Sequence, residues 1–294
     1  MKIGTGVAAV ALVAVIFVFT KGIPANGGDP ETNLRQAITK LSEAETLRFD
    51  GNLTLSLPAR PDGTSRPFNV VEARMSGDAR QVNDKRDYEM QGRIYLEAKG
   101  RGNSIFSDGQ IILLDDKTLF NLEELPALLN PGMSLTGKWV KVPGAMAHTN
   151  NPMQVFNGLM DASSSWEYQK EETWKGRRVL VYQGALPSQV EKDLAAMWQQ
   201  SASGNRGLGV LARLMNTSDV KIVEIRVDTK SQELVEIKAI FDRETTNGSR
   251  EEAAVVSLGF SDYGKAVDIA EPEASVELDP QLFKSLFGAG ELPQ

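Results

Sequence analysis

The sequence predicts an α+β protein: a single long curved antiparallel sheet, or half-barrel, with a few helices packed on its concave face. An N-terminal transmembrane or signal segment precedes it. Three observations lead to this prediction: an uncharged apolar run at residues 3–20, long stretches that alternate between apolar and polar residues, and a small number of clear helix starts. The expected organisation is a signal or anchor segment at 1–21, a linker at 22–29 and one half-barrel domain at 30–294.

The N-terminal segment places the protein in or beyond a membrane. Residues 3–20 carry no charge, and at about 1.5 Å per helical residue they span roughly 27 Å, close to the bilayer's hydrocarbon thickness of about 30 Å. This length favours a retained single-pass anchor. Cleavage as a signal peptide after Ala25 is the alternative. The protein is therefore expected at the extracytoplasmic face of the cell membrane, or secreted if the segment is cleaved.

Composition excludes several kinds of chemistry. The chain has no cysteine, which removes disulfides, thiolate nucleophiles, cysteine-ligated metals and an acylated lipoprotein anchor. Its 32 basic and 39 acidic residues give a net charge of −7, and the basic residues are scattered among the acidic ones. No nucleic-acid partner is expected from this pattern.

The first soluble element is predicted to be a helix that begins at Asp29 and Pro30, a cap followed by a proline suited to the first turn. Apolar residues at 34, 37, 38 and 41 then follow helical spacing and predict a packing face. Further helix starts are indicated at Asn151-Pro152, at the capping box from Ser188 to Glu191, and at Asp279-Pro280. No alternation of strands and helices suggests a parallel nucleotide-binding sheet.

From Leu47 the period changes to two, and apolar positions 47, 49, 51, 53, 55 and 57 alternate with polar ones. This pattern is typical of a half-buried antiparallel strand. It returns at 71–79 and 94–98, and later segments at 166–173, 178–183, 220–228, 234–243 and 253–260 bring the expected number of strands to about nine or ten. Turns are predicted at Asp108-Gly109, which would separate a hairpin of 104–106 and 111–114, and at Lys175-Gly176 and Asn247-Gly248.

A search for catalytic or metal-binding groups favours no enzyme. The single histidine, His148, has no acidic neighbour and cannot build a usual zinc site alone. Gly204 to Gly209 lacks the strand before it and the Lys-Ser/Thr ending of a phosphate loop. The carboxylate pairs at 115–116 and 123–124 are interpreted as solvated charge, and the serines at 163–165 lack a nucleophile-elbow setting. No catalytic residue, metal or cofactor is therefore predicted.

Three parts of the chain resemble the periplasmic lipoprotein-carrier superfamily, which comprises the LolA/LolB-like proteins and the mycobacterial LppX/LprG lipid carriers. They are the helix at 34–41 running into the strand at 46–57, the strand at 137–142, and the meander at 223–228, 234–241 and 258–269 that closes with Glu271-Pro272. In order and spacing the resemblance covers most of residues 30–275. The chain departs from the lipoprotein branch because it has no cysteine to acylate.

The resemblance implies a half-barrel with an apolar cavity for acyl chains and no catalysis. The first hypothesis is accordingly a non-enzymatic envelope protein that binds a lipid or other hydrophobic ligand as carrier, receiver or sensor, with a membrane partner at its N-terminal segment. The alternative is a protein-interaction module, or an accessory subunit of an envelope complex, whose interior is packed solid. The ligand-binding candidates are taken from the more apolar parity of the strands: Phe49, Leu53, Leu55, Ala73, Met75, Ile94, Leu96 and Trp139.

Overall fold

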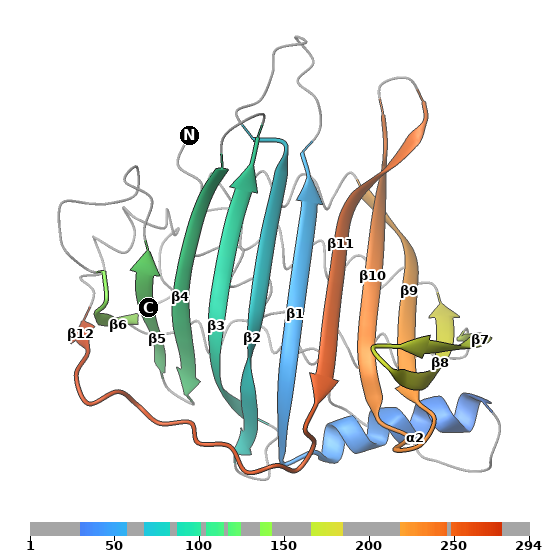
Figure 1. Cartoon of the computed structure of the whole chain (residues 1–294), viewed down its shortest axis with the longest axis horizontal. Coiled ribbons are helices and arrows are strands. Elements are labelled where there is room, and N and C mark those ends of the chain that lie inside the picture. The colour runs from blue at the N-terminus through green and yellow to red at the C-terminus, as the bar shows by residue number, and fades with distance from the viewer. Residues whose placement is uncertain are drawn as a thin grey trace, which may run out of the picture.

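A computed structural model of the protein describes residues 30–57, 68–82, 87–100, 104–114, 117–124, 136–142, 166–184, 218–245 and 248–277. In these ranges the chain forms one helix and one open, curved sheet of twelve strands (Figure 1). None of the helical structure in them is long and apolar enough to span a bilayer. The predicted segment at 1–21, the linker, and the helices predicted after Asn151, Ser188 and Asp279 lie outside the described residues.

The sheet is built outward from β1 (Thr46–Ser56), which lies near its middle. On one side it continues through β2 (Val70–Val82), β3 (Asp87–Lys99), β4 (Ser104–Leu114), β5 (Lys117–Glu124) and β6 (Trp139–Val142) to β12 (Val276–Glu277). On the other side follow β11 (Arg250–Ser261), β10 (Leu234–Glu244), β9 (Ser218–Asp228), β8 (Arg177–Gly184) and β7 (Glu167–Trp174).

Strand pairing confirms the predicted antiparallel half-barrel. Every neighbouring pair is antiparallel except β12 and β6, which run parallel. The meander from β1 to β6 and the meander from β7 to β11 meet where β1 pairs with β11, with Phe49 opposite Phe260. The sheet thus has twelve strands where about nine or ten were predicted.

The alternation in β1 determines the two faces of the sheet. The five residues 47, 49, 51, 53 and 55 are buried, whereas those that alternate with them are exposed or half-buried. We call the side to which these leucine and phenylalanine side chains point the inner face and the opposite side the outer face. Because side chains alternate along a strand, the cross-strand register carries this assignment from β1 to every neighbour.

The helix α2 (Pro30–Glu43) packs on the inner face and crosses behind β9 and β10 (Figure 1). Its predicted apolar stripe, Leu34, Ala37, Ile38 and Leu41, is at most 2% exposed and belongs to the same core as the inner-face residues. Near the last turn, Lys40 Nζ donates a hydrogen bond of 2.5 Å to the carbonyl oxygen of Ser231 in the turn between β9 and β10. The helix therefore covers one end of one half of the sheet.

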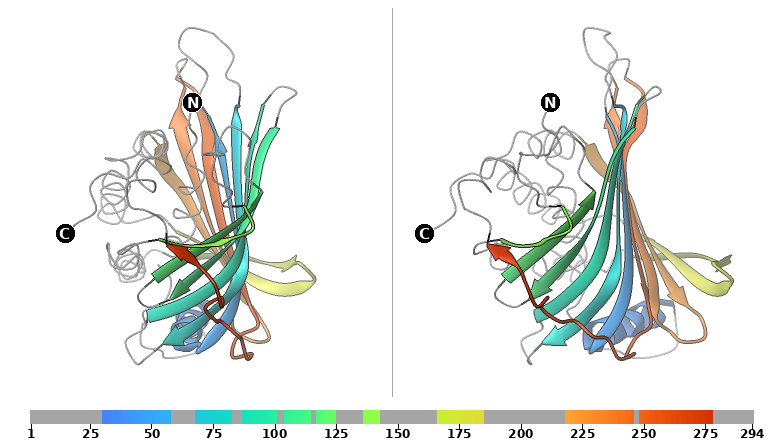
Figure 2. Two further views of the ribbon diagram at one scale, coloured as in Figure 1. Left: turned by 90° about the vertical axis from the view of Figure 1, so that its left-hand side faces the viewer. Right: turned by 60° about the vertical axis from the view of Figure 1, so that its left-hand side comes forward.

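A row of Phe49, Gly77 and Gly92 allows neighbouring strands to approach closely where the sheet curves. Phe49 lies opposite Gly77, which lies opposite Gly92. A methyl group on Gly77 would lie 2.1 Å from the carbonyl oxygen of Gln91, and one on Gly92 would lie 3.4 Å from Phe49 Cζ. The two glycines thus leave room for the backbones and for the phenyl ring, and β2 and β3 bend strongly toward their lower ends (Figure 2).

The turn predicted at Asp108-Gly109 is wrong, because β4 runs unbroken from Ser104 to Leu114. The Asp108 carboxylate accepts hydrogen bonds from Arg93 on β3, and Gly109 lies opposite Ile94 on the inner face. At this dipeptide the structure has no turn, only a register irregularity between Asp108 and Gly109 in the pairing with β5. Cross-strand pairing on both sides has overridden the local turn propensity of this dipeptide.

Residues 262–277, which we call the strap, run past the lower strand ends from β11 to β12 (Figures 1 and 2). At its start the Tyr263 hydroxyl donates a hydrogen bond of 2.6 Å to the carbonyl oxygen of Leu234. Farther along, Arg80 Nη2 donates to the carbonyl oxygen of Ile269 at 3.2 Å, and Lys117 Nζ lies 2.5 Å from a carboxylate oxygen of Glu271. The strap thus ties β10, β2 and β5 together before it pairs with β6.

The β7–β8 hairpin projects on the outer side of the sheet (Figure 2). Its turn confirms the prediction at Lys175-Gly176, where both residues have positive φ, 46° and 78°. Val179 and Val181 of the hairpin form a small buried cluster with Val235 of β10, and Trp174 packs against it.

Candidate ligand-binding face

The inner face brings together seven of the eight predicted ligand-binding residues. Phe49, Leu53 and Leu55 on β1, Ala73 and Met75 on β2, and Ile94 and Leu96 on β3 all belong to the main core and are 0–8% exposed. The register makes them neighbours, since Leu53 lies opposite Ala73, which lies opposite Leu96. These seven side chains form a single continuous surface.

The predicted set covers only part of this surface, which continues onto the second meander. One row of paired inner-face residues crosses the eight strands β8, β9, β10, β11, β1, β2, β3 and β4. Its members in that order are Tyr182, Ile225, Ile237, Leu258, Gly51, Met75, Ile94 and Gly109. The first four were missed by the sequence reasoning, although the alternation at 223–227 carried the signal for Ile225.

Small residues and apolar character distinguish the middle of this face. Gly51, Ala73 and Gly109 lie in adjacent inner-face rows, and Ala239 occupies a similar place on β10. No inner position of β1, β2 or β3 holds Asp, Glu, Lys or Arg. An apolar surface of this kind provides the hydrophobic contacts that binding of an apolar chain requires.

Trp139, the eighth predicted residue, lies on the outer face, which corrects its assignment to the same surface. It pairs with Asn121 on β5, whereas the inner-face residue of that part of the register is Phe120 opposite Val140. Trp139 packs against a separate small core of Ile112, Leu119 and Ile269, the last of these supplied by the strap.

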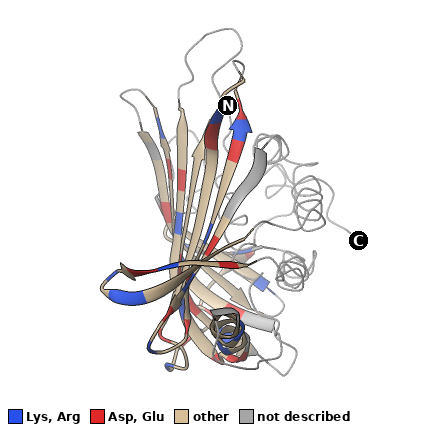
Figure 3. Cartoon of the chain, turned by 90° about the vertical axis from the view of Figure 1, so that its right-hand side faces the viewer, with Lys and Arg blue, Asp and Glu red and all other residues tan. Residues whose placement is uncertain are grey.

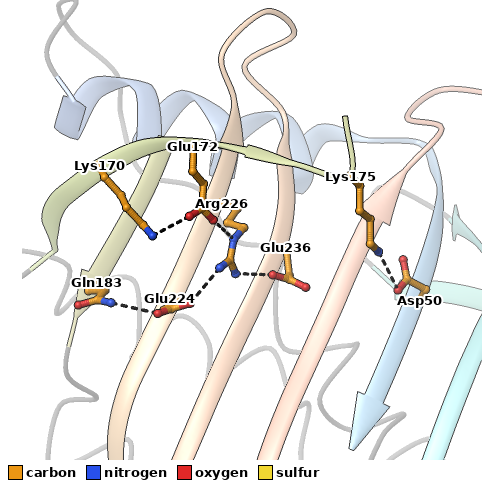
Figure 4. Close-up of polar contacts among 8 residues, drawn as sticks. All are labelled: Asp50, Lys170, Glu172, Lys175, Gln183, Glu224, Arg226 and Glu236. Atoms are coloured by element: carbon orange, nitrogen blue, oxygen red, sulfur yellow. Dashed lines mark hydrogen bonds and ion pairs between the residues drawn. The ribbon is translucent and has the colours of Figure 1, made fainter. Parts of the chain in front are cut away.

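The outer face carries a charged cluster centred on Arg226 of β9, whose side chain is 13% exposed (Figure 4). Its guanidinium lies 3.1 Å from Glu172 on β7 and 3.2 Å from Glu224 on its own strand, and it also pairs with Glu236 on β10. Lys170 Nζ is 2.7 Å from Glu172, and at the hairpin tip Lys175 Nζ lies 3.8 Å from the Asp50 carboxylate on β1. These contacts hold the hairpin over the outer face.

The pKa values of Glu172 and Glu236, two of the carboxylates around Arg226, are shifted in opposite directions. Hydrogen bonds from Lys170 and then Arg226 lower the pKa of Glu172. Burial raises the pKa of Glu236, although Arg226 opposes that effect. Burial also acts against the charge of Arg226, but its hydrogen bond with Glu172 and its ion pairs keep the pKa of the guanidinium above its ordinary value. These charged side chains pair with one another, and the cluster therefore has a structural role.

No group of three or more potential metal ligands occurs in the part of the chain that the structure describes. Basic and acidic residues are interspersed along the strands and the hairpin instead of being gathered by sign (Figure 3). His148, Gly204–Gly209 and the serines at 163–165 lie outside the described residues.

No protein-family model matches the sequence, and no curated protein matches it. Among solved structures the chain is similar to LprF from Mycobacterium bovis, with 12% identity over 84% of this chain and 99% of that chain and a TM-score of 0.43. It is also similar to an outer membrane lipoprotein-sorting protein domain from Vibrio parahaemolyticus, with 10% identity over 82% and 95% of the two chains and a TM-score of 0.25.

A third similar structure is a DUF1329 family protein from Desulfovibrio piger, with 8% identity, coverage of 82% and 96%, and a TM-score of 0.25. The likeness to these three structures is one of fold alone.

Proposed function

We propose that this is a non-enzymatic extracytoplasmic protein that holds a lipid or another hydrophobic ligand against the inner face of its half-barrel. The observation that supports this proposal is the apolar inner surface that crosses eight strands, with glycine and alanine along its middle. Among the described residues the only helix on that surface is α2, which covers β9 and β10.

The hydrophobic effect is large enough for such binding. Each buried CH2 group of an acyl chain contributes about 0.8 kcal/mol, so about twelve of them contribute roughly 10 kcal/mol before the costs of association. No polar or charged inner-face residue is needed for this part of the affinity. The head group of the ligand would be recognised elsewhere or left in water.

The proposed location is the outer side of a membrane, with residues 3–20 as anchor and the half-barrel domain of 30–294 beyond the linker. An anchored protein of this kind acts as a fixed receiver or sensor of lipid, because the anchor prevents free passage between membranes. If the segment is cleaved, the same domain becomes a diffusible carrier.

An interaction module with a solid interior is the second candidate, and one observation favours it. The seven predicted residues on the inner face of β1 to β3 are only 0–8% exposed, as the side chains of a filled protein core are. The two functions therefore differ in whether the space above Ala73 belongs to a ligand or to the protein.

The test fills that space with a larger side chain. Ala73→Phe, on the inner face of β2, is compared with Ser76→Phe, on the exposed outer face of the same strand, in the full-length protein. Lipid that copurifies with each variant is extracted and quantified by mass spectrometry, and stability is measured by urea denaturation. Because both variants keep residues 3–20, lipid held by that segment contributes equally.

A lipid binder would lose stoichiometric lipid in Ala73→Phe and keep its stability, whereas Ser76→Phe would keep both. A solid core would carry no stoichiometric lipid in any variant, and Ala73→Phe would destabilise it by about 1–3 kcal/mol through overpacking. The second result would overturn the lipid proposal and favour the interaction module.

A further inference from the structure

The tip of the β7–β8 hairpin, residues 174–178, has a charge opposite to that of the whole chain. It contains Lys175, Arg177 and Arg178 and no acidic residue, whereas the chain has a net charge of −7. All three cations are exposed, and the side chains of Lys175 and Arg178 are 60% and 75% exposed. Both signs of charge are interspersed over the rest of the sheet, but Figure 3 shows blue at the end of the projecting hairpin.

The tip is held in a defined conformation. Lys175 and Gly176, both with positive φ, form the tight turn between the two strands. Behind them Trp174 packs on the small cluster of three valines, and the Lys175 ammonium lies 4.4 Å from the centroid of the Trp174 ring. The cations therefore project from a braced turn, which lowers the entropy cost of binding through them.

The acidic neighbours of the tip hold its cations only weakly. Lys175 Nζ lies 3.8 Å from the Asp50 carboxylate, and Arg178 pairs with Glu171. The Asp50 side chain is 63% exposed, and ion pairs between exposed side chains contribute little to stability and are screened by salt. A phosphate group of a lipid can replace such a carboxylate as the partner of the cation.

The proposed anchor places a membrane on the side of the molecule that carries this hairpin. Helix α2 leads into β1, and Figure 1 shows its first turn, far from β1, at the same border of the sheet as the hairpin. Both elements face the viewer in Figure 3. The linker at 22–29 spans at most about 29 Å when fully extended. A membrane that holds residues 3–20 therefore lies within about that distance of the start of α2.

We propose that the tip of the β7–β8 hairpin docks on the anionic lipid head groups of the membrane that holds residues 3–20. The proposal rests on the proposed membrane location and is independent of lipid binding by the inner face. Each Lys or Arg near an anionic membrane surface contributes about 1 kcal/mol, so the three cations favour the docked state roughly 100-fold. Docking turns the border of the sheet that carries the hairpin toward the bilayer.

A single fluorescent label tests the docking, because the natural chain has no cysteine to compete for the label. Full-length Thr173→Cys, labelled at this exposed position beside the tip, is reconstituted into phosphatidylcholine vesicles with or without phosphatidylglycerol. The vesicles also contain a lipid that carries the acceptor dye. Energy transfer to the acceptor is expected to be higher in the vesicles with phosphatidylglycerol. That difference should disappear between about 0.1 M and about 1 M salt, as the screening length falls from about 10 Å to about 3 Å.

Two matched variants separate the tip from the net charge of the protein. In the labelled chain, Arg177→Gln/Arg178→Gln is expected to lower the docking equilibrium about 30-fold and to abolish the effect of phosphatidylglycerol. The control, Arg93→Gln/Lys138→Gln, removes two charges from exposed residues on the other half of the sheet and is expected to keep the effect. Each variant breaks one exposed ion pair, Arg178 with Glu171 or Arg93 with Asp108, so the losses of stability are comparable.

The proposal is overturned if energy transfer is equal in the two kinds of vesicle, or if the tip variant lowers it no more than the control does. Flotation of the vesicles tests the anchor separately. A chain that floats only with phosphatidylglycerol would support the docking and refute the anchor, and a chain that floats with neither vesicle would overturn both. Lipid that copurifies with the natural chain reports on the inner face alone, whatever the tip does.

Discussion

A graded prediction for three Gly→Ala substitutions compares Gly77 and Gly92, in the row at the bend of the sheet, with Gly259 on β11. At Gly77 the added methyl group would lie 2.1 Å from the carbonyl oxygen of Gln91 and 2.5 Å from the Cα of Gly92. Carbon atoms normally approach to about 3.5–4.0 Å, so the two backbones must separate by about 1 Å. We expect a cost of about 3 kcal/mol, at the upper end of overpacking.

The contact is less close at Gly92, and at Gly259 it is with a movable side chain. At Gly92 the methyl group would lie 2.9 Å from the carbonyl oxygen of Ser76, and we expect a cost of about 1 kcal/mol. At Gly259 it would lie 2.4 Å from a carboxylate oxygen of Asp50, a side chain that is 63% exposed and can rotate away. Alanine also lowers the conformational entropy of the unfolded chain, which stabilises the fold by about 0.4–1 kcal/mol. We therefore expect Gly259→Ala to be neutral or slightly stabilising.

Urea denaturation followed by tryptophan fluorescence measures the free energy of unfolding of each variant. For a domain of this size about 1 kcal/mol corresponds to about 2–4 °C in Tm, so Gly77→Ala should melt roughly 6–12 °C below the natural protein. The expected order of damage is Gly77→Ala, then Gly92→Ala, then Gly259→Ala. A Gly77→Ala protein as stable as Gly259→Ala would refute the close approach of β2 and β3 on which the reasoning depends.

Three further predictions concern the outer face and the strap. Arg226→Met leaves three carboxylates without their shared guanidinium and should lower the free energy of unfolding in urea by about 3 kcal/mol. Glu172→Gln and Glu236→Gln should have opposite pH dependence. The lowered pKa of Glu172 means that its stabilising charge is present above the unfolded pKa and lost as pH falls through the folded pKa. The free energy of unfolding of Glu172→Gln should therefore lie further below that of the natural protein as pH rises from about 3 to about 6. The raised pKa of Glu236 means that stability is lost as pH rises through that pKa. In a denaturation series from about pH 4 to 7, the free energy of unfolding of Glu236→Gln should therefore increase relative to that of the natural protein. Tyr263→Phe removes the hydrogen bond to Leu234 and should cost about 1 kcal/mol, also seen as faster amide exchange at the start of the strap.

Period-two patterning was sufficient to predict which residues of a strand share a face, because side chains alternate between the two faces along the strand. Phe49, Leu53 and Leu55 were placed on one surface from the alternation of β1 alone, and the structure confirms that shared surface. Helix α2 was predicted from an equally local signal, its proline start and its apolar spacing.

The errors arise where contacts distant in sequence decide the local structure. Trp139 stands in a strand of four residues, too short for alternation to show which face is buried, and its cover Ile269 comes from the strap. Asp108 and Gly109 have the composition of a turn, yet Arg93 and Ile94 on the neighbouring strand hold them in β4. The approach of the hairpin to Asp50 depends similarly on a contact between distant strands.

The strap also bears on the order in which the fold can be completed. β6 receives its outer neighbour from residues 276–277, which follow every other described strand in the chain, so this border stays open while a nascent polypeptide is still being synthesised or translocated. Open strand borders are templates for wrong pairing between molecules. A chain halted before the strap would therefore carry a nearly finished sheet in which β6 has no neighbour on its outer side, and its release should need a chaperone more than the release of the finished chain does.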